Sequence, residues 1–212
     1  MKYLDIQNWS RKEHYEFFKD FDEPYFGIVA DIDCTNAYKF CKQNNISFFA
    51  YYLHKSLIAV NTIEEFRYRI IDDKITVFDK IHAAATIGRD DGTFAFTLIE
   101  YIEEFTEFYD NLNSQIAKVQ QSSGLFMYDD KFRKDVIHYS TTPWLQFKGL
   151  THARKFSTGE STPIIVFGKI FEENENYKMP VSVNAHNSLM DAMHVAKYYQ
   201  EFTKLLDHFQ DN

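Results

Sequence analysis

Pairs of short apolar segments joined by polar turns constrain the fold of this 212-residue chain more than any other feature. In each pair, apolar and β-branched residues alternate on both sides of a turn rich in Asp, Asn, Glu or Gly, a pattern that predicts a β-hairpin. The pairs are FRYRII with ITVFD around Asp72-Asp73, AAATIG with TFAFTLIEY around 89–92, and TPIIVFGKIF with KMPVSVNAH around 172–176.

Other segments predict helices and a further strand. FGIVADIDCT (26–35) alternates like a strand, and helical spacing of apolar residues covers 36–43, 47–63, 103–121 and 191–209. Ser47 is the expected N-cap of the second of these helices. The chain has no repeat, low-complexity tract or Ser/Gly-rich linker, so we expect a single domain over 1–212. Hairpins grouped with helices predict an α+β fold with a mixed sheet.

Composition excludes several classes of protein. The chain carries 23 Lys and Arg against 31 Asp and Glu, a net charge of −8, which argues against a nucleic-acid partner. Its N-terminus lacks a signal-peptide layout, and its apolar runs are too short to span a bilayer, so no membrane association is expected. Cys34 and Cys41 are too few for a disulfide framework. A cytoplasmic protein is expected.

Motifs for metals and nucleotides are missing from the sequence. It contains no HExxH, GxGxxG, GxxxxGK[ST] or GxSxG, and its eight His residues show no metal-ligand spacing. We therefore expect no metal cofactor. A 17% aromatic fraction, by contrast, suits a sheet-rich core or a pocket lined with rings.

The segment from Val183 to His194 combines a strand end, polar residues and a helix start. Asp191 and His194 lie three residues apart and would share a helical face. Two interpretations stay open at this stage. The segment could hold an acid–imidazole pair at a strand-to-helix corner, or it could be a helix N-terminus with an acidic first turn.

MPVSVNAHNSLMDAMHV (179–195) resembles the signature of chloramphenicol acetyltransferases, in which a strand ending in Gln-x-His-His leads to Asp-Gly-(Phe/Tyr)-His. Five other segments resemble family motifs in the same order, without large insertions. They are NWSRKEHYEFF, FRYRIIDDKITVFD, GTFAF, HYSTTPWLQF and TPIIVFGK. The resemblance implies a two-layer α+β sandwich, in which a large mixed sheet packs with helices in the CoA-dependent acyltransferase fold.

The resemblance also implies a reaction and its residues. Family members are homotrimers that transfer acetyl from acetyl-CoA to a small hydroxylated acceptor at subunit interfaces. The oxyanion-stabilising Ser matches Ser140, and the structural Asp–Arg pair matches Asp191 and Arg11. Trp144 and Lys169 fall near the CoA channel. The acceptor pocket matches Phe18, Phe94, Phe126 and Val166, where Phe18 replaces a Tyr of some members and Val166 replaces a Thr.

The departure from the family lies at the catalytic base. Without a gap, Asn187 occupies the position of the catalytic His, and His186 matches the first His of the pair, which is not the base. A carboxamide cannot take up a proton near neutral pH as an imidazole can. Loss of a general base usually costs about 10²–10⁴ in rate. His186 is a possible substitute base only if the strand register slips by one residue.

Three hypotheses follow from these residues. In the first, the protein is an acyltransferase that works slowly, or with a base supplied by the substrate, water or His186. In the second, it is a degenerate homologue that binds a small molecule or CoA without turnover, and Asn187 favours this. In the third, it is a structural trimer with a closed channel.

Overall fold

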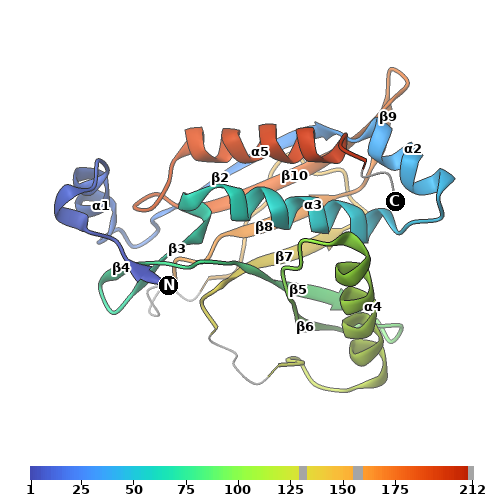
Figure 1. Ribbon diagram of the computed structural model, residues 1–212, viewed down its shortest axis with the longest axis horizontal. Helices are drawn as coiled ribbons and strands as arrows, with labels where there is room; N and C mark the ends of the chain where they lie inside the picture. The colour runs from blue at the N-terminus through green and yellow to red at the C-terminus, as the bar shows by residue number, and fades with distance from the viewer. Residues whose placement is uncertain (129–132, 155–159, 210–212) are drawn as a thin grey trace.

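The computed structural model describes residues 1–128, 133–154 and 160–209 (Figure 1). The helices and short 3₁₀ turns are η1 (Ile6–Asn8), α1 (Lys12–Phe18), α2 (Thr35–Gln43), α3 (Phe48–Thr62), η2 (Glu64–Arg67), α4 (Phe105–Gln121) and α5 (Ala192–Leu206). The strands are β1 (Lys2–Tyr3), β2 (Tyr25–Asp33), β3 (Tyr68–Ile71), β4 (Lys74–Val77), β5 (His82–Gly88), β6 (Phe94–Ile99), β7 (Val136–Thr142), β8 (Ile164–Gly168), β9 (Phe171–Glu173) and β10 (Asn176–His186).

A large mixed sheet runs in the order β2-β10-β8-β7-β5-β6, and β9 pairs with β10. The hairpin β5–β6 is antiparallel as expected, whereas β7 lies parallel to both β5 and β8. The predicted hairpin at 162–186 is more complex than the sequence suggests. TPIIVFGKIF divides into β8 and β9, and both segments pair with the long strand β10.

Helices α3 and α5 lie side by side along the sheet, and α4 packs near β5 and β6 (Figure 1). Helix α3 is buried around most of its circumference, as its nearly continuous apolar sequence requires. Ser47 caps it by accepting a hydrogen bond from the amide of Ala50, as predicted. The structure therefore confirms the mixed sheet packed with helices.

A smaller sheet, β1-β4-β3, lies beside the N-terminal helix α1 and contains the predicted hairpin around Asp72-Asp73. Both Asp residues have positive φ values, 48° and 58°, as a two-residue hairpin turn of this kind requires. Arg69 on β3 is fully buried and donates hydrogen bonds to backbone carbonyls, including that of Lys134 before β7. This side chain joins the small sheet to the large one.

The last helix differs from its predicted bounds. Helix α5 begins at Ala192 and ends at Leu206, rather than covering 191–209. Asp191 has extended backbone angles and is the N-cap, so it precedes the helix instead of lying on its face. An Asp side chain at this position satisfies a free amide of the first turn, which explains why the helix starts one residue later.

Candidate functional site

An ion pair holds the corner between β10 and α5. Arg11 Nη1 contacts Asp191 Oδ2, and the Arg11 side chain is only 12% exposed. Arg11 Nη2 also donates to the carbonyl oxygen of Asn187 at 3.3 Å. The start of α1 is thus attached to the turn that follows β10. The structure brings together three of the residues singled out in the sequence: Arg11, Asn187 and Asp191.

The first turn of α5 is a capping box built by Asp191 and His194. Asp191 Oδ1 accepts from the amide of Met193 at 3.0 Å, and His194 Nδ1 accepts from the amide of Asp191 at 3.1 Å. His194 Nε2 lies 3.3 Å from Glu65 Oε1. Both ring nitrogens of His194 are therefore engaged, Nδ1 with the first turn of α5 and Nε2 with Glu65.

Both sequence interpretations of this corner describe part of it. The acid and the imidazole are in contact, with His194 Nδ1 2.8 Å from Asp191 Oδ1. Their contact, however, is the cap of a helix, so its first role is to fix the helix start. The pKa of Asp191 is lowered: burial opposes ionisation, but His194 and Arg11 outweigh it.

Asn187 lies in the turn directly after β10. Its amide donates to the carbonyl of Pro24 at 2.8 Å, and its carbonyl accepts from Arg11. The residue is half-buried. Its backbone is therefore held from two sides, by the segment before β2 and by the helix α1. That its carboxamide stands at the position of the family's base stays a prediction from the sequence.

His186 ends β10, and its side chain points into the protein. It is 5% exposed, its Nδ1 accepts from the amide of Ser188 at 3.3 Å, and its ring meets the edge of Tyr25 with centroids 5.2 Å apart. Burial, aided by the charge of Arg154, lowers its pKa to about 4. The register of β10 against β2 runs continuously from Lys178 to His186, without a slip. His186 as a substitute base remains a prediction, and these contacts argue against it.

Ser140 and Val166 are direct neighbours on the adjacent strands β7 and β8. Val166 is 2% exposed, and Ser140 is half-buried. Ser140 borders a narrow crevice with the aromatic side chain of Phe49 and with Thr86. The Ser hydroxyl is thus placed in the middle of the sheet, on a rigid strand rather than on a loop.

The predicted pocket aromatics form two separate groups. On β6, Phe94 and Phe96 have ring centroids 5.5 Å apart, and Phe96 lies 5.3 Å from Phe126. Phe94 is 47% exposed. On α1, Phe18 packs against Phe17 and Phe21. Strand β6 forms one edge of the large sheet, and helix α1 lies on the far side of the molecule from β6 (Figure 1). The aromatic rings of β6 and those of α1 therefore do not meet within one chain.

Trp144 and Lys169 follow the parallel strands β7 and β8. The amide of Lys169 donates to the carbonyl of Leu145 at 2.8 Å, so the two segments are joined just beyond the strands. Trp144 is 78% exposed and Lys169 is exposed. Contact of these two side chains with CoA stays a prediction.

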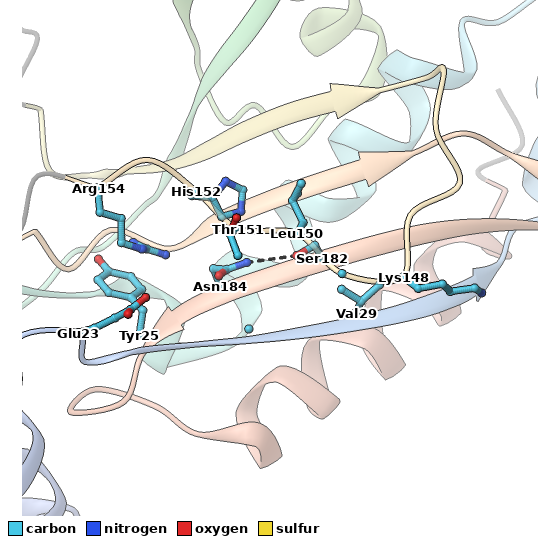
Figure 2. A pocket seen from close by; sticks show the side chains of 12 residues that line it. Glu23, Tyr25, Val29, Lys148, Leu150, Thr151, His152, Arg154, Ser182 and Asn184 are labelled. Atoms are coloured by element: carbon cyan, nitrogen blue, oxygen red, sulfur yellow. Dashed lines mark hydrogen bonds between the residues drawn. The ribbon is translucent and has the colours of Figure 1, made fainter.

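A polar cavity of about 380 Å³ lies between β2, β10 and residues 148–154 (Figure 2). The Arg154 guanidinium stacks on Tyr25 at 3.4 Å from the ring centroid, and Asn184 Nδ2 donates to Ser182 Oγ at 3.1 Å. Lys148 lies at the other end. None of the predicted site residues lines this cavity. Its lining comes from three distant segments, so no sequence motif marks it.

The residues that the structure describes hold neither a metal-binding cluster nor a membrane-spanning helix. Within residues 1–128, 133–154 and 160–209, His, Cys, Asp and Glu form no group that could hold a metal ion. Over the same residues, no helix is long and apolar enough to cross a membrane.

The sequence profile of the family described as "Chloramphenicol acetyltransferase" matches residues 1–203. The chain belongs to this family. A chloramphenicol acetyltransferase from Proteus mirabilis is 24% identical over 205 residues, which cover 96% of this chain and 94% of that protein. Chloramphenicol acetyltransferase 3 from Escherichia coli is 26% identical over 203 residues, 95% of each chain.

Solved structures agree with the family assignment. A chloramphenicol acetyltransferase structure matches with a TM-score of 0.90 at 28% identity, covering 97% of this chain and 99% of that one. A probable dihydrolipoamide acetyltransferase from Listeria monocytogenes matches with a TM-score of 0.66 at 12% identity, which shows a shared fold alone. Membership of the chloramphenicol acetyltransferase family confirms the resemblance seen in the sequence motifs and the expected fold.

Proposed function

We propose that this member of the chloramphenicol acetyltransferase family binds acetyl-CoA as co-substrate and transfers its acetyl group to small hydroxylated acceptors slowly. The observation that carries the proposal is the corner of Arg11, Asn187 and Asp191. There the ion pair and the backbone of the turn are in place, while a carboxamide stands at the base position. Positioning and the hydroxyl of Ser140 would support a residual rate.

The proposed site is assembled between copies of the chain, as a homotrimer in the cytoplasm. In one chain, Asn187 lies after β10 near one edge of the sheet, whereas Phe94 and Phe126 lie at the opposite edge. Residues so far apart can share one acceptor only if a second copy brings its own edge to the first. Cys34 and Cys41 are both buried free thiols, which suits a reducing compartment.

The roles of the remaining residues follow from this arrangement. Ser140 would donate to the oxyanion that forms on the thioester carbonyl, and Trp144 and Lys169 would contact CoA. Phe18, Phe94, Phe126 and Val166 would surround the acceptor. The carboxamide of Asn187 can donate or accept a hydrogen bond but cannot remove the acceptor's proton. The alternative function, binding of a small molecule or CoA without turnover, is favoured by this same residue.

Three measurements test the proposal. Titration calorimetry should show binding of acetyl-CoA, and sedimentation should show a trimer. Release of CoA thiol with chloramphenicol should be weak for the wild type and rise by about 10²–10⁴ in Asn187→His. Asn187→Gln, which changes size without adding a base, is the matched control and should not gain activity. Binding without turnover in any variant would support the alternative, and no binding at millimolar acetyl-CoA would leave only a structural trimer.

A further inference from the structure

Asp191 and His194, two titratable residues at the corner beside Asn187, are both engaged in other contacts. Asp191 binds Arg11 through one oxygen and the first turn of α5 through the other. His194 accepts from the amide of Asp191 on one ring nitrogen and faces Glu65 with the other. Neither side chain can act on a proton at Asn187 without breaking the cap of α5.

His186 directly precedes Asn187, and its imidazole is buried. Its ring lies in the interior against Tyr25, it is 5% exposed, and its Nδ1 accepts from the amide of Ser188. Asp191, His194 and His186 are thus all engaged, and position 187 itself offers a hydrogen-bonding carboxamide rather than an imidazole.

Acceptors differ in how much they depend on a base. An alcohol is a weak nucleophile until its proton is removed, and a general base contributes about 10²–10⁴ to that reaction. A thiol has a pKa near 8.5, so about a few per cent of it is already thiolate at pH 7, and the thiolate is the nucleophile. We infer, on the basis of the proposed acetyl-CoA site, that this site transfers acetyl to small thiols faster than to the hydroxylated acceptors, which it acetylates slowly.

The chemistry of such a transfer balances without a protein base. The acceptor thiol loses its proton to solvent, and its sulfur attacks the carbonyl carbon of the acetyl thioester. The carbonyl oxygen becomes an oxyanion, which the hydroxyl of Ser140 can stabilise. The bond from carbon to the CoA sulfur then breaks. CoA leaves as a thiolate and takes a proton from solvent, so one thioester replaces another and no net proton is consumed.

Pairs of acceptors that differ only by sulfur and oxygen test the inference. Dithiothreitol is compared with threitol, and N-acetylcysteamine with N-acetylethanolamine, each with acetyl-CoA and the full-length protein. Acetylated acceptor and CoA are quantified by chromatography with mass detection, because free thiols disturb thiol-release assays. The rate without protein is subtracted. We expect each thiol to react at least about 100-fold faster than its alcohol partner, the lower end of what a base supplies.

The pH dependence provides a second readout. Below the pKa of the acceptor thiol, the rate should rise about tenfold per pH unit, because the thiolate fraction does. The plot of rate against pH should bend at the pKa of the acceptor thiol. With a more acidic thiol, this inflection should lie at lower pH, by the difference between the two thiol pKa values. An inflection that stays at one pH for all thiols would point to a base on the protein and would overturn the inference.

Variants complete the test. Asn187→His should raise the rate with alcohols by about 10²–10⁴ and so narrow the ratio of thiol to alcohol rates. His14→Gln, at an exposed position on α1, should leave this ratio unchanged. If acetyl-CoA binds but thiols react no faster than alcohols, or no faster than without protein, the inference fails while the acetyl-CoA site stands. If acetyl-CoA does not bind, the proposed function itself fails.

Discussion

Arg11 and Asp191, 180 residues apart in the chain, form an ion pair that joins the start of α1 to the start of α5. The same guanidinium reaches the carbonyl of Asn187. The turn that carries Asn187 is therefore fixed by a residue from the opposite end of the sequence. Its position does not depend on the local chain alone.

Breaking this pair should cost stability. We expect Arg11→Met to lower the free energy of unfolding by about 1–2 kcal/mol, because Asp191 and the Asn187 carbonyl lose a charged donor while Asp191 remains partly solvated. A double-mutant cycle with Asp191→Asn, measured by denaturant unfolding, should give a coupling of at least about 0.5 kcal/mol. The exposed pair of Lys19 and Glu16 is the control and should show no measurable coupling. Additive effects of Arg11 and Asp191 would contradict a direct interaction.

Acid should destabilise the protein below pH 6.5 through its buried imidazoles. Burial lowers the pKa of His54 to about 4, and hydrogen bonds to the carbonyls of Ile102 and Glu103 oppose it only in part. Between pH 6.5 and 4, the unfolded chain therefore binds a proton that the folded chain does not. The free energy of unfolding therefore decreases as the pH is lowered from 6.5 to 4. The decrease is up to about 1.4 kcal/mol per pH unit for each such imidazole.

His186 adds to this effect, because burial and Arg154 lower its pKa to about 4 as well. In His54→Gln, the amide can still donate to the carbonyls of Ile102 and Glu103 but does not titrate. Its curve of stability against pH should be flatter than that of the wild type between pH 6.5 and 4. The comparison is made by urea unfolding at several pH values, with the exposed His14→Gln as control. An unchanged slope in His54→Gln would show that this imidazole titrates normally in the fold.

Gly168 at the end of β8 has no room for a side chain. A Cβ placed there would lie 2.9 Å from Phe147 Cε1, 3.0 Å from Pro180 Cγ and 3.1 Å from the carbonyl of Leu145. We expect Gly168→Ala to destabilise the protein by about 1–3 kcal/mol, because the contact with the backbone oxygen cannot relax by a rotamer change. Gly88→Ala meets nothing within 4 Å and should be close to neutral in the same thermal unfolding experiment.

Arg69 is fully buried and holds the β3–β4 hairpin on the large sheet. Its acceptors are the carbonyl oxygens of Phe66, Tyr68, Lys134 and Val136. Arg69→Met should cost about 3–5 kcal/mol, since these oxygens lose their charged donor. Lys39→Met, at an exposed position of α2, is the control for removal of a positive charge. Thermal unfolding of the two variants would contradict the prediction if their midpoints were equal.

Local patterns predicted the elements of this fold well. The hairpins β3–β4 and β5–β6 and the helices α2, α3 and α4 form where alternation and helical spacing indicated. The errors of these predictions from sequence patterns have local causes. The helix predicted from Asp191 starts at Ala192, because an Asp that caps an amide must itself be extended. The strand predicted from Thr162 to Phe171 breaks at Lys169 and Ile170, where the chain passes from β8 to β9.

The amino-acid sequence by itself determined the family and the order of the elements, because these depend on residue types and their spacing. It also predicts that Asn187 replaces the expected base. Only the tertiary structure decided how the two imidazoles close to Asn187 in the sequence, His186 and His194, are engaged. His186 is buried against Tyr25, and His194 is locked between Asp191 and Glu65. It also decided that Asn187 and Phe94 stand near opposite edges of one sheet. The physical reason is that burial, hydrogen-bond partners and strand order arise from contacts between residues far apart in the chain, which no local pattern contains.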